Sequence, residues 1–239
     1  MPKNKTLLES VTYAVAVLLC ILVLAWVVRL WEADFTIPLW FESDALFYQT
    51  LIKGLIENGW GLHNKCIGMP AGLDLHDVPI PDNLHFGLIK LISFFAPNSA
   101  ATLNIFALLT FPLVTITSLF VFRCLNLSRP TSIVASLLYA FLPYHFLRLG
   151  GHTLLSAYYA VPLATLVIVW AFSTEPVFFR HDETKNNYRL SILSRKSLIS
   201  IVVCAVVAST GIYYAFFPSS FWSSLSFIIF SLAKELTLP

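Results

Sequence analysis

The first long apolar run of the chain reads VTYAVAVLLCILVLAWVVRL at residues 11–30 and holds one charged side chain, Arg29. A helix of about 20 apolar residues crosses the hydrocarbon core of a bilayer, which is roughly 30 Å thick. The basic start MPKNKTLLES would suit a signal peptide, but the run ends in RLWEAD without a small-residue cleavage pattern. We therefore predict a retained membrane anchor.

The composition of the whole chain extends this prediction. Of its 239 residues, 57% are hydrophobic and 12% are charged, and the mean hydropathy is +0.77. A soluble domain carries about a quarter charged residues, so we predict an integral membrane protein. The net charge of +2 is small and dispersed, which argues against nucleic acid as a partner. The four cysteines form no C-x-x-C pair, so they predict small buried side chains and no zinc site or disulfide framework.

The hydropathy pattern predicts an all-α integral membrane protein of about six transmembrane helices, forming one membrane domain over residues 1–239. We expect the spans near residues 8–30, 100–122, 131–149, 154–172, 198–217 and 220–234. Basic residues collect on one side of these spans: Lys3, Lys5, Arg123, Arg129, Arg180, Lys185, Arg189, Arg195 and Lys196. The positive-inside rule places that side, with the N-terminus, in the cytoplasm, as in a multi-pass protein of the plasma (inner) membrane.

The large first loop, residues 31–99, is then expected on the outer face, and it carries two helical patterns. From Ala45 to Asn58 apolar and polar residues alternate with a helical period, which predicts a helix lying in the membrane interface. A second interfacial helix is expected from Leu84 to Phe95, where about 18 Å of helix would be too short to span alone.

An acidic pair, Glu42 and Asp44, stands at the start of the first of these helices, in the stretch WFESDALFYQ at residues 40–49. Asp44 is well placed to cap the helix, although Phe47 stands where a capping box needs Glu or Gln. Glu42 alone is typical of a solvated loop. The Glu-x-Asp spacing nevertheless places two carboxylates near one point, where they could hold a divalent cation or a sugar hydroxyl.

The anchor, the long outer loop, the ESD motif at residues 42–44 and the interfacial helix together resemble the GT-C superfamily of membrane glycosyltransferases. The resemblance covers the layout of residues 1–172, and at the level of residues it is confined to Glu42 and Asp44. Members of this superfamily carry an acidic D-x-D, E-x-D or D-E motif in the first outer loop, followed by two short helices parallel to the membrane.

The resemblance implies transfer of a sugar from a polyprenyl-phosphate or polyprenyl-diphosphate donor to an acceptor at the outer face, within the cell envelope. Asp44 would act as the general base on the acceptor hydroxyl, and Glu42 would orient Asp44 or share a metal with it. Some members use Mg²⁺ or Mn²⁺ and others use no metal. The superfamily usually has more spans, so we expect a chain truncated relative to its family, with a membrane protein partner completing the fold.

Two further groups carry candidate substrate-binding residues. In DLHDVPIPDNLHF, residues 74–86, Asp77 and His85 are the candidates for substrate contact, with loop packing or a metal as the alternatives. In LPYHFLRLGGHTLL, residues 142–155, Arg148 either reaches the lipid headgroups or clamps the donor phosphate. The predicted substrate-binding set is Arg148, His145, His152, Asp77, His85 and Lys90.

Two other classes of function fit the same spans. The first is a non-catalytic carrier or flippase-like subunit for a lipid-linked sugar, and the second is a structural assembly subunit. A transporter should carry ionisable or broken-helix features near the middle of its spans. Here the spans are nearly free of charge and the polar residues gather at one face, which favours chemistry at the interface.

Overall fold

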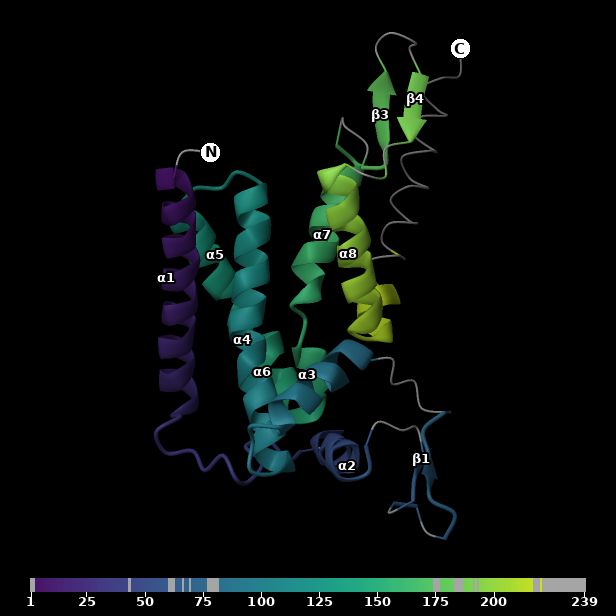
Figure 1. Cartoon of the computed structure of the whole chain (residues 1–239). Coiled ribbons are helices and arrows are strands. Elements are labelled where there is room, and N and C mark those ends of the chain that lie inside the picture. Colours follow the sequence, from purple (N-terminus) through teal and green to yellow (C-terminus); the bar gives the residue numbers. More distant parts are fainter. Residues whose placement is uncertain are drawn as a thin grey trace, which may run out of the picture. The chain divides into compact units, whose positions relative to one another are not determined.

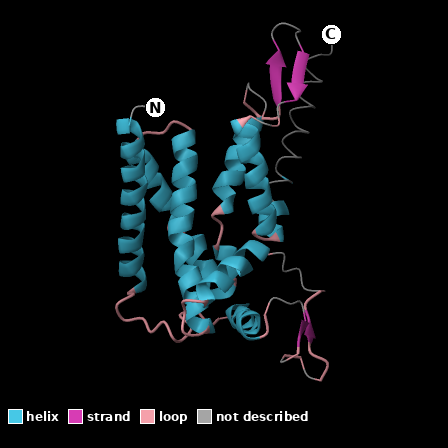
Figure 2. Ribbon diagram, viewed as in Figure 1, coloured by secondary structure: helices cyan, strands magenta, loops and turns pink. Residues whose placement is uncertain are grey.

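The computed structural model describes residues 3–42, 44–59, 63–65, 67–68, 70–76, 82–173, 177–182, 187–190, 192, 194–216 and 220. The described chain is mostly helical, as Figures 1 and 2 show. It divides into two compact units, Met1–Tyr159 and Ala160–Pro239.

The first unit holds the helices that are long and apolar enough to cross a membrane. These segments are Thr6–Val28, Ser99–Cys124 and Arg129–Gly151. The first lies within α1 (Lys3–Val28), the second is α4 (Ser99–Cys124), and the third combines α5 (Arg129–Ala140) with α6 (Pro143–Gly151). The membrane character predicted from composition therefore has a structural basis in the part of the chain that is described.

The third segment is broken, although the sequence predicts one span over residues 131–149. Leu142 is extended, with φ −57° and ψ 143°, and Pro143 starts α6. A residue that precedes proline is disfavoured in the helical region, because the proline ring clashes with its backbone. Pro143 therefore separates α5 from α6.

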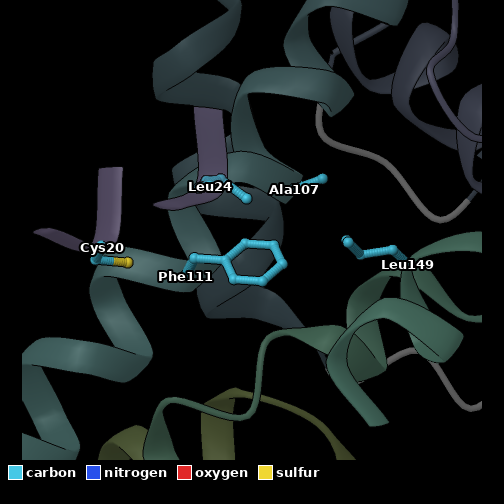
Figure 3. Close-up of a cluster of buried hydrophobic side chains, with 5 residues drawn as sticks. All are labelled: Cys20, Leu24, Ala107, Phe111 and Leu149. Carbon is cyan, nitrogen blue, oxygen red and sulfur yellow. The ribbon is translucent and has the colours of Figure 1, made fainter. Parts of the chain in front are cut away.

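A buried cluster joins α1, α4 and α6, and Figure 3 shows its side chains converging. Its members are Cys20 and Leu24 of α1, Ala107 and Phe111 of α4, and Leu149 of α6. Small residues allow helices to approach closely, which is the main source of helix association in lipid. Because Cys20 and Ala107 are both fully buried, they fit this role at the contact between α1 and α4.

At the opposite end of α1 and α4, charged side chains connect these two helices to each other and to α5. Glu9 of α1 accepts hydrogen bonds from Arg123 at the end of α4, with its Oε1 2.7 Å from Nη2. The same Oε1 lies 3.0 Å from Nη2 of Arg129 at the start of α5. The three side chains are about one-third exposed or less, so this charge cluster joins three helices at one end of the unit.

Shorter elements lie between the anchor and α4. Helices α2 (Asp44–Glu57) and α3 (Asn83–Ser93) occupy the two stretches predicted to be helical, and they pack against each other and against α4. Between them, β1 (His63–Asn64) and β2 (Leu73–Asp74) form a small antiparallel hairpin. The location of α2 and α3 in a membrane interface stays a prediction.

The second unit contains α7 (Ala160–Ala171) packed against α8 (Arg195–Ser209), and an antiparallel pair β3 (Phe179–Asp182) and β4 (Asn187–Leu190). Helices of 12 and 15 residues reach about 18 and 22 Å, which is less than a hydrocarbon core needs. The helices α7 and α8 are thus shorter than the spans predicted at residues 154–172 and 198–217. Most of the sixth, residues 220–234, lies outside the described residues, so the number six stays a prediction.

The cysteines differ in their surroundings. Cys20 is buried, Cys124 is half-buried and Cys204 is exposed. The prediction of small buried side chains therefore holds for Cys20 and is wrong for Cys204. Cys66 lies outside the described residues.

Candidate functional site

The centre of the candidate site is a contact between Asp44 and His152. Oδ2 of Asp44, in the first turn of α2, lies 2.6 Å from Nδ1 of His152. His152 follows the last residue of α6. The side chains are 47% and 39% exposed, so both can be reached from outside the protein. The structure thus joins the predicted base to a residue that the sequence placed in a separate group.

The carboxylate of Glu42 lies close to the C-terminal end of α6, near His152. A Cβ built on Gly150 would lie 3.7 Å from Oε2 of Glu42, so this carboxylate lies against the backbone of Gly150. The backbone carbonyl of Glu42 accepts a hydrogen bond from the amide of Ala45, which ties Glu42 to the first turn of α2. Glu42 thus lies against the end of α6 that carries His152, and Asp44 contacts His152 directly; these three residues are here named the α2–α6 cluster.

The direction of the His152 ring follows from the turn that carries it. The amide of His152 donates to the carbonyl of Arg148 at 2.8 Å, which closes the end of α6. The carbonyl of His152 then accepts from Leu155 at 2.8 Å and starts η1 (Thr153–Ser156), a short 3₁₀ helix. These hydrogen bonds fix the backbone of His152, and its ring lies against Asp44 at the start of α2.

The position of Asp44 suits a negative charge. The first turn of a helix carries unpaired amide groups and the positive end of the helix dipole, which stabilise a nearby carboxylate. Ser43, which precedes the helix, lies outside the described residues. The capping interpretation and the base interpretation of Asp44 thus remain compatible.

Asn104, which the sequence analysis did not single out, anchors the segment that leads to this cluster. Its side chain is buried in α4, and its Oδ1 accepts from the amide of Leu39 at 3.0 Å. Its Nδ2 donates to the carbonyls of Phe35 and Ile37, at 3.1 and 2.7 Å. An amide inside an otherwise apolar span was the available signal, because buried polar groups in membrane helices need partners.

Arg148 lies one helical turn before His152, at the end of α6. Its guanidinium carbon is 5.3 Å from the centre of the Tyr144 ring, a cation–π contact. Among the residues that the structure describes, no carboxylate lies within ion-pair distance of Arg148. A guanidinium held on an aromatic ring without an acidic partner can accept a phosphate.

His145 is placed differently from the prediction. It is fully buried in α6, stacked on Phe111 with ring centres 3.7 Å apart. Its Nδ1 lies 2.8 Å from the carbonyl of Ala140, and its Nε2 lies 2.8 Å from Oγ1 of Thr110. A carbonyl only accepts, so Nδ1 donates to Ala140, and Nε2 lies within hydrogen-bond distance of the Thr110 hydroxyl. Both nitrogens therefore have protein partners, and a substrate would have to displace one of them.

The two candidates on α3 also make contacts within the protein. His85 is fully buried, with its Nδ1 3.5 Å from Oδ1 of Asp82. Lys90 donates to the carbonyls of Leu55 and Ile56, at 3.0 and 3.4 Å, and so binds the C-terminal end of α2. That end lies roughly 16 Å along the helix from Asp44. The structure thus does not bring these two residues into the α2–α6 cluster.

The remaining candidates concern the loop and a metal. Asp77 lies outside the described residues. Asp74 and His76 stay on the hairpin, where Oδ1 of Asp74 is 3.8 Å from Nε2 of His76 and both side chains are well exposed. Within the described ranges, no group of three or more His, Cys, Asp or Glu side chains is arranged to hold a metal ion. The role of Mg²⁺ or Mn²⁺ therefore stays a prediction.

Comparisons of the chain with protein-family models, with curated proteins and with solved structures gave no match. The resemblance to the GT-C superfamily rests on Glu42, Asp44 and the order of the elements.

Proposed function

We propose that the chain is a membrane glycosyltransferase of the GT-C type. It would move a sugar from a polyprenyl-phosphate or polyprenyl-diphosphate donor to an acceptor hydroxyl at the outer face of the membrane. The observation that carries the proposal is the 2.6 Å contact between Asp44 and His152, with Glu42 against the neighbouring turn. A base held in orientation by a further side chain is a recurring arrangement for removing a proton from a nucleophile, and here Asp44 would be the base and His152 the orienting group.

In the proposed reaction Asp44 is the general base. It takes the proton of the acceptor hydroxyl while the hydroxyl oxygen bonds to the anomeric carbon of the donor sugar. The bond from that carbon to the phosphate oxygen breaks, and the polyprenyl (di)phosphate leaves with the electron pair. His152 donates a hydrogen bond from Nδ1 to Asp44 and so fixes the orientation of the carboxylate.

Arg148 supplies the charge that the leaving group needs. The leaving phosphate gains negative charge as the bond breaks, and a guanidinium nearby stabilises that charge. Arg148 lies in the last turn of α6, one turn from His152, so the base and the cation come from one short segment. Its ring contact with Tyr144 limits the orientations of the guanidinium before a donor binds.

The placement in the membrane follows from the order of the helices. The α2–α6 cluster lies at the end of α1 where residues 29–42 begin, and the Glu9 charge cluster lies at the other end. With the N-terminus in the cytoplasm, as the distribution of basic residues indicates, the α2–α6 cluster would face outward. A multi-pass protein of the inner membrane is therefore the proposed setting.

The test is Asp44→Asn in the purified full chain, reconstituted in liposomes with a panel of synthetic polyprenyl-phosphate sugars. Release of polyprenyl phosphate is measured in the presence of membrane extract as the acceptor source. We expect wild-type protein to release it, and Asp44→Asn to lower the rate by at least about 100-fold, the size of a general-base contribution. Asp74→Asn, an exposed aspartate on the hairpin, is the matched control and should leave the rate unchanged. Equal rates for wild type and Asp44→Asn contradict the proposal.

A further inference from the structure

A cavity of about 430 Å³ lies along α2, apart from the α2–α6 cluster. It belongs wholly to the first unit. Its lining comes from α2, from the hairpin region and from the start of α4: Gln49, Thr50, Lys53, Gly54, Glu57, Asn58, Asn64, Ile67 and Ser99. Its volume is in the range of sites for small organic ligands, roughly 300–1,000 Å³.

The cavity opens on the side of α2 that is turned away from Asp44. Gln49, Lys53 and Glu57 recur every four residues and form one stripe of the helix. At about 100° per residue, this stripe is roughly 140–220° around the helix axis from Asp44. A ligand in the cavity would therefore bind separately from the groups that carry the proposed reaction.

The hairpin supplies the facing wall. Asn64 of β1 is buried, and a Cβ built on Gly54 would lie 2.3 Å from its Nδ2, so the amide of Asn64 occupies the space that a side chain at residue 54 would need. Nδ2 of Asn58 also donates to Oδ1 of Asn64 at 3.3 Å. The shape of the cavity thus depends on the close approach of Asn64 to Gly54.

Most residues that line the cavity carry polar side chains, whereas most ligand sites are lined mainly by apolar and aromatic side chains; the carbon atoms of these residues still form the larger part of the cavity surface. The lining includes three carboxamides (Gln49, Asn58 and Asn64) and the hydroxyls of Thr50 and Ser99, groups that can both donate and accept hydrogen bonds. Lys53 and Glu57 lie 3.9 Å apart, so their charges offset each other. The chemistry matches a neutral polyhydroxylated ligand, whose hydroxyl groups also donate and accept.

Gln49 gives a second, independent observation. Its Nε2 is buried and has no hydrogen-bond partner among the residues that the structure describes. Buried amide donors without a partner are rare in folded proteins. A ligand hydroxyl oxygen in the cavity would provide the missing acceptor.

We propose that this cavity binds a neutral carbohydrate unit. The proposal does not depend on the glycosyltransferase reaction, since none of its residues belongs to the α2–α6 cluster. Because Lys53 is already paired with Glu57, the described lining offers no unpaired cation to the carboxylate of a uronate. The cavity would serve to hold a sugar chain close to the protein while its reacting end lies elsewhere.

Saturation-transfer NMR on the full chain in nanodiscs of phosphatidylcholine and phosphatidylglycerol tests the site. Nanodiscs are needed because alkyl maltoside detergents carry a competing sugar headgroup. The probes are methyl α-D-mannoside, methyl β-D-glucoside and N-acetylglucosamine, with glucuronate as the charged comparison. We expect saturation transfer to at least one neutral probe and a weaker signal for glucuronate. Absence of transfer to all three neutral probes, or equal transfer to glucuronate, overturns the proposal.

Two glycines provide matched variants. Gly54→Ala forces Asn64 away and should weaken probe binding about tenfold, the equivalent of one lost hydrogen bond. Gly87→Ala lies on α3 with nothing within 4 Å of the added Cβ, and it should bind as wild type does.

Gln49→Leu should weaken binding without moving the hairpin. Asp44→Asn should bind the probes normally, which separates this site from the proposed reaction. Wild-type binding by both Gly54→Ala and Gln49→Leu contradicts the assignment of the cavity.

Discussion

Asp44 and His152 keep 47% and 39% of their side-chain surface exposed, although their polar atoms lie 2.6 Å apart. An ion pair this exposed typically contributes about 0–1 kcal/mol to folding, because water competes for both groups. The local turn of α6 and η1 already orients His152 without the pair. The contact between Asp44 and His152 is therefore expected to contribute little to the free energy of folding. We attribute it to the proposed proton transfer.

A double-mutant cycle of Asp44→Asn and His152→Gln separates stability from chemistry. We expect a coupling free energy for unfolding below about 1 kcal/mol, since the pair is half exposed. In sugar transfer we expect His152→Gln to lose about tenfold and the double variant to be no slower than Asp44→Asn, because residues that act as a unit are not additive. Chemical unfolding in detergent and initial transfer rates give the two cycles.

Asp74 and His76, a second exposed Asp–His pair, are the control for this cycle. They are 3.8 Å apart, are more exposed than Asp44 and His152, and lie on the hairpin. His76→Gln should leave transfer unchanged. Additive losses of rate for Asp44→Asn and His152→Gln would show that the two residues act separately, which contradicts a shared role.

The segment between α1 and α2 is held in its conformation mainly by hydrogen bonds to another part of the chain. Its order comes from α4: Asn104 makes three hydrogen bonds to the backbone of residues 35–39, and Asn98 donates to the carbonyl of Thr36 at 2.9 Å. The hydroxyl and amide of Thr36 also bind Asp34, which keeps the pKa of that carboxyl below its ordinary value. Glu42 and Asp44 are thus positioned through a helix distant in the sequence.

Asn104→Leu tests whether α4 positions the cluster. The variant keeps the branching and the number of side-chain heavy atoms but leaves the Leu39 amide and two carbonyls without their partner, so we expect a loss of about 2 kcal/mol in unfolding free energy. We also expect slower sugar transfer, because the start of α2 loses its support. Thermal unfolding in detergent and the polyprenyl phosphate release assay are the measurements.

Ser118→Ala is the matched control, since Ser118 is also buried in α4 but donates only to carbonyls of its own helix. It should change transfer little. Unchanged transfer in folded Asn104→Leu protein would show that the loop holds its conformation without α4.

How much of this arrangement the sequence predicted depends on the kind of signal. The helices of the first unit follow from apolar runs and helical periodicity, which are local properties, so α1, α2, α3 and α4 lie near the predicted ranges. The break at Pro143 needed the conformation of the residue before the proline. The hairpins were not predicted, because strands of two to four residues carry too little pattern. The pairing of Asp44 with His152 depends on tertiary contact between α2 and α6, which no local pattern contains.

The first unit carries its charge at the two ends of its helices and leaves an apolar surface between them. On α1, Leu7, Leu18, Leu22 and Trp26 are all more than half exposed. A soluble monomer rarely exposes so much apolar surface in one place, and lipid is the solvent that suits it. At one end lies the Glu9 charge cluster, and at the other end lie the segment from residue 29 and the α2–α6 cluster.

Cysteine labelling tests the orientation that the proposed reaction requires. In a chain whose four cysteines are replaced by serine, Lys65→Cys reports the loop with the hairpin, and Leu125→Cys reports the end of α4 near Arg123; both positions are exposed. With the N-terminus in the cytoplasm, a membrane-impermeant maleimide should label Lys65→Cys in intact cells and Leu125→Cys only after permeabilisation. The reverse pattern would place the α2–α6 cluster in the cytoplasm, away from a donor presented at the outer face. Labelling of both positions in intact cells would show that α4 does not cross the membrane. This result would contradict the transmembrane orientation proposed for the first unit.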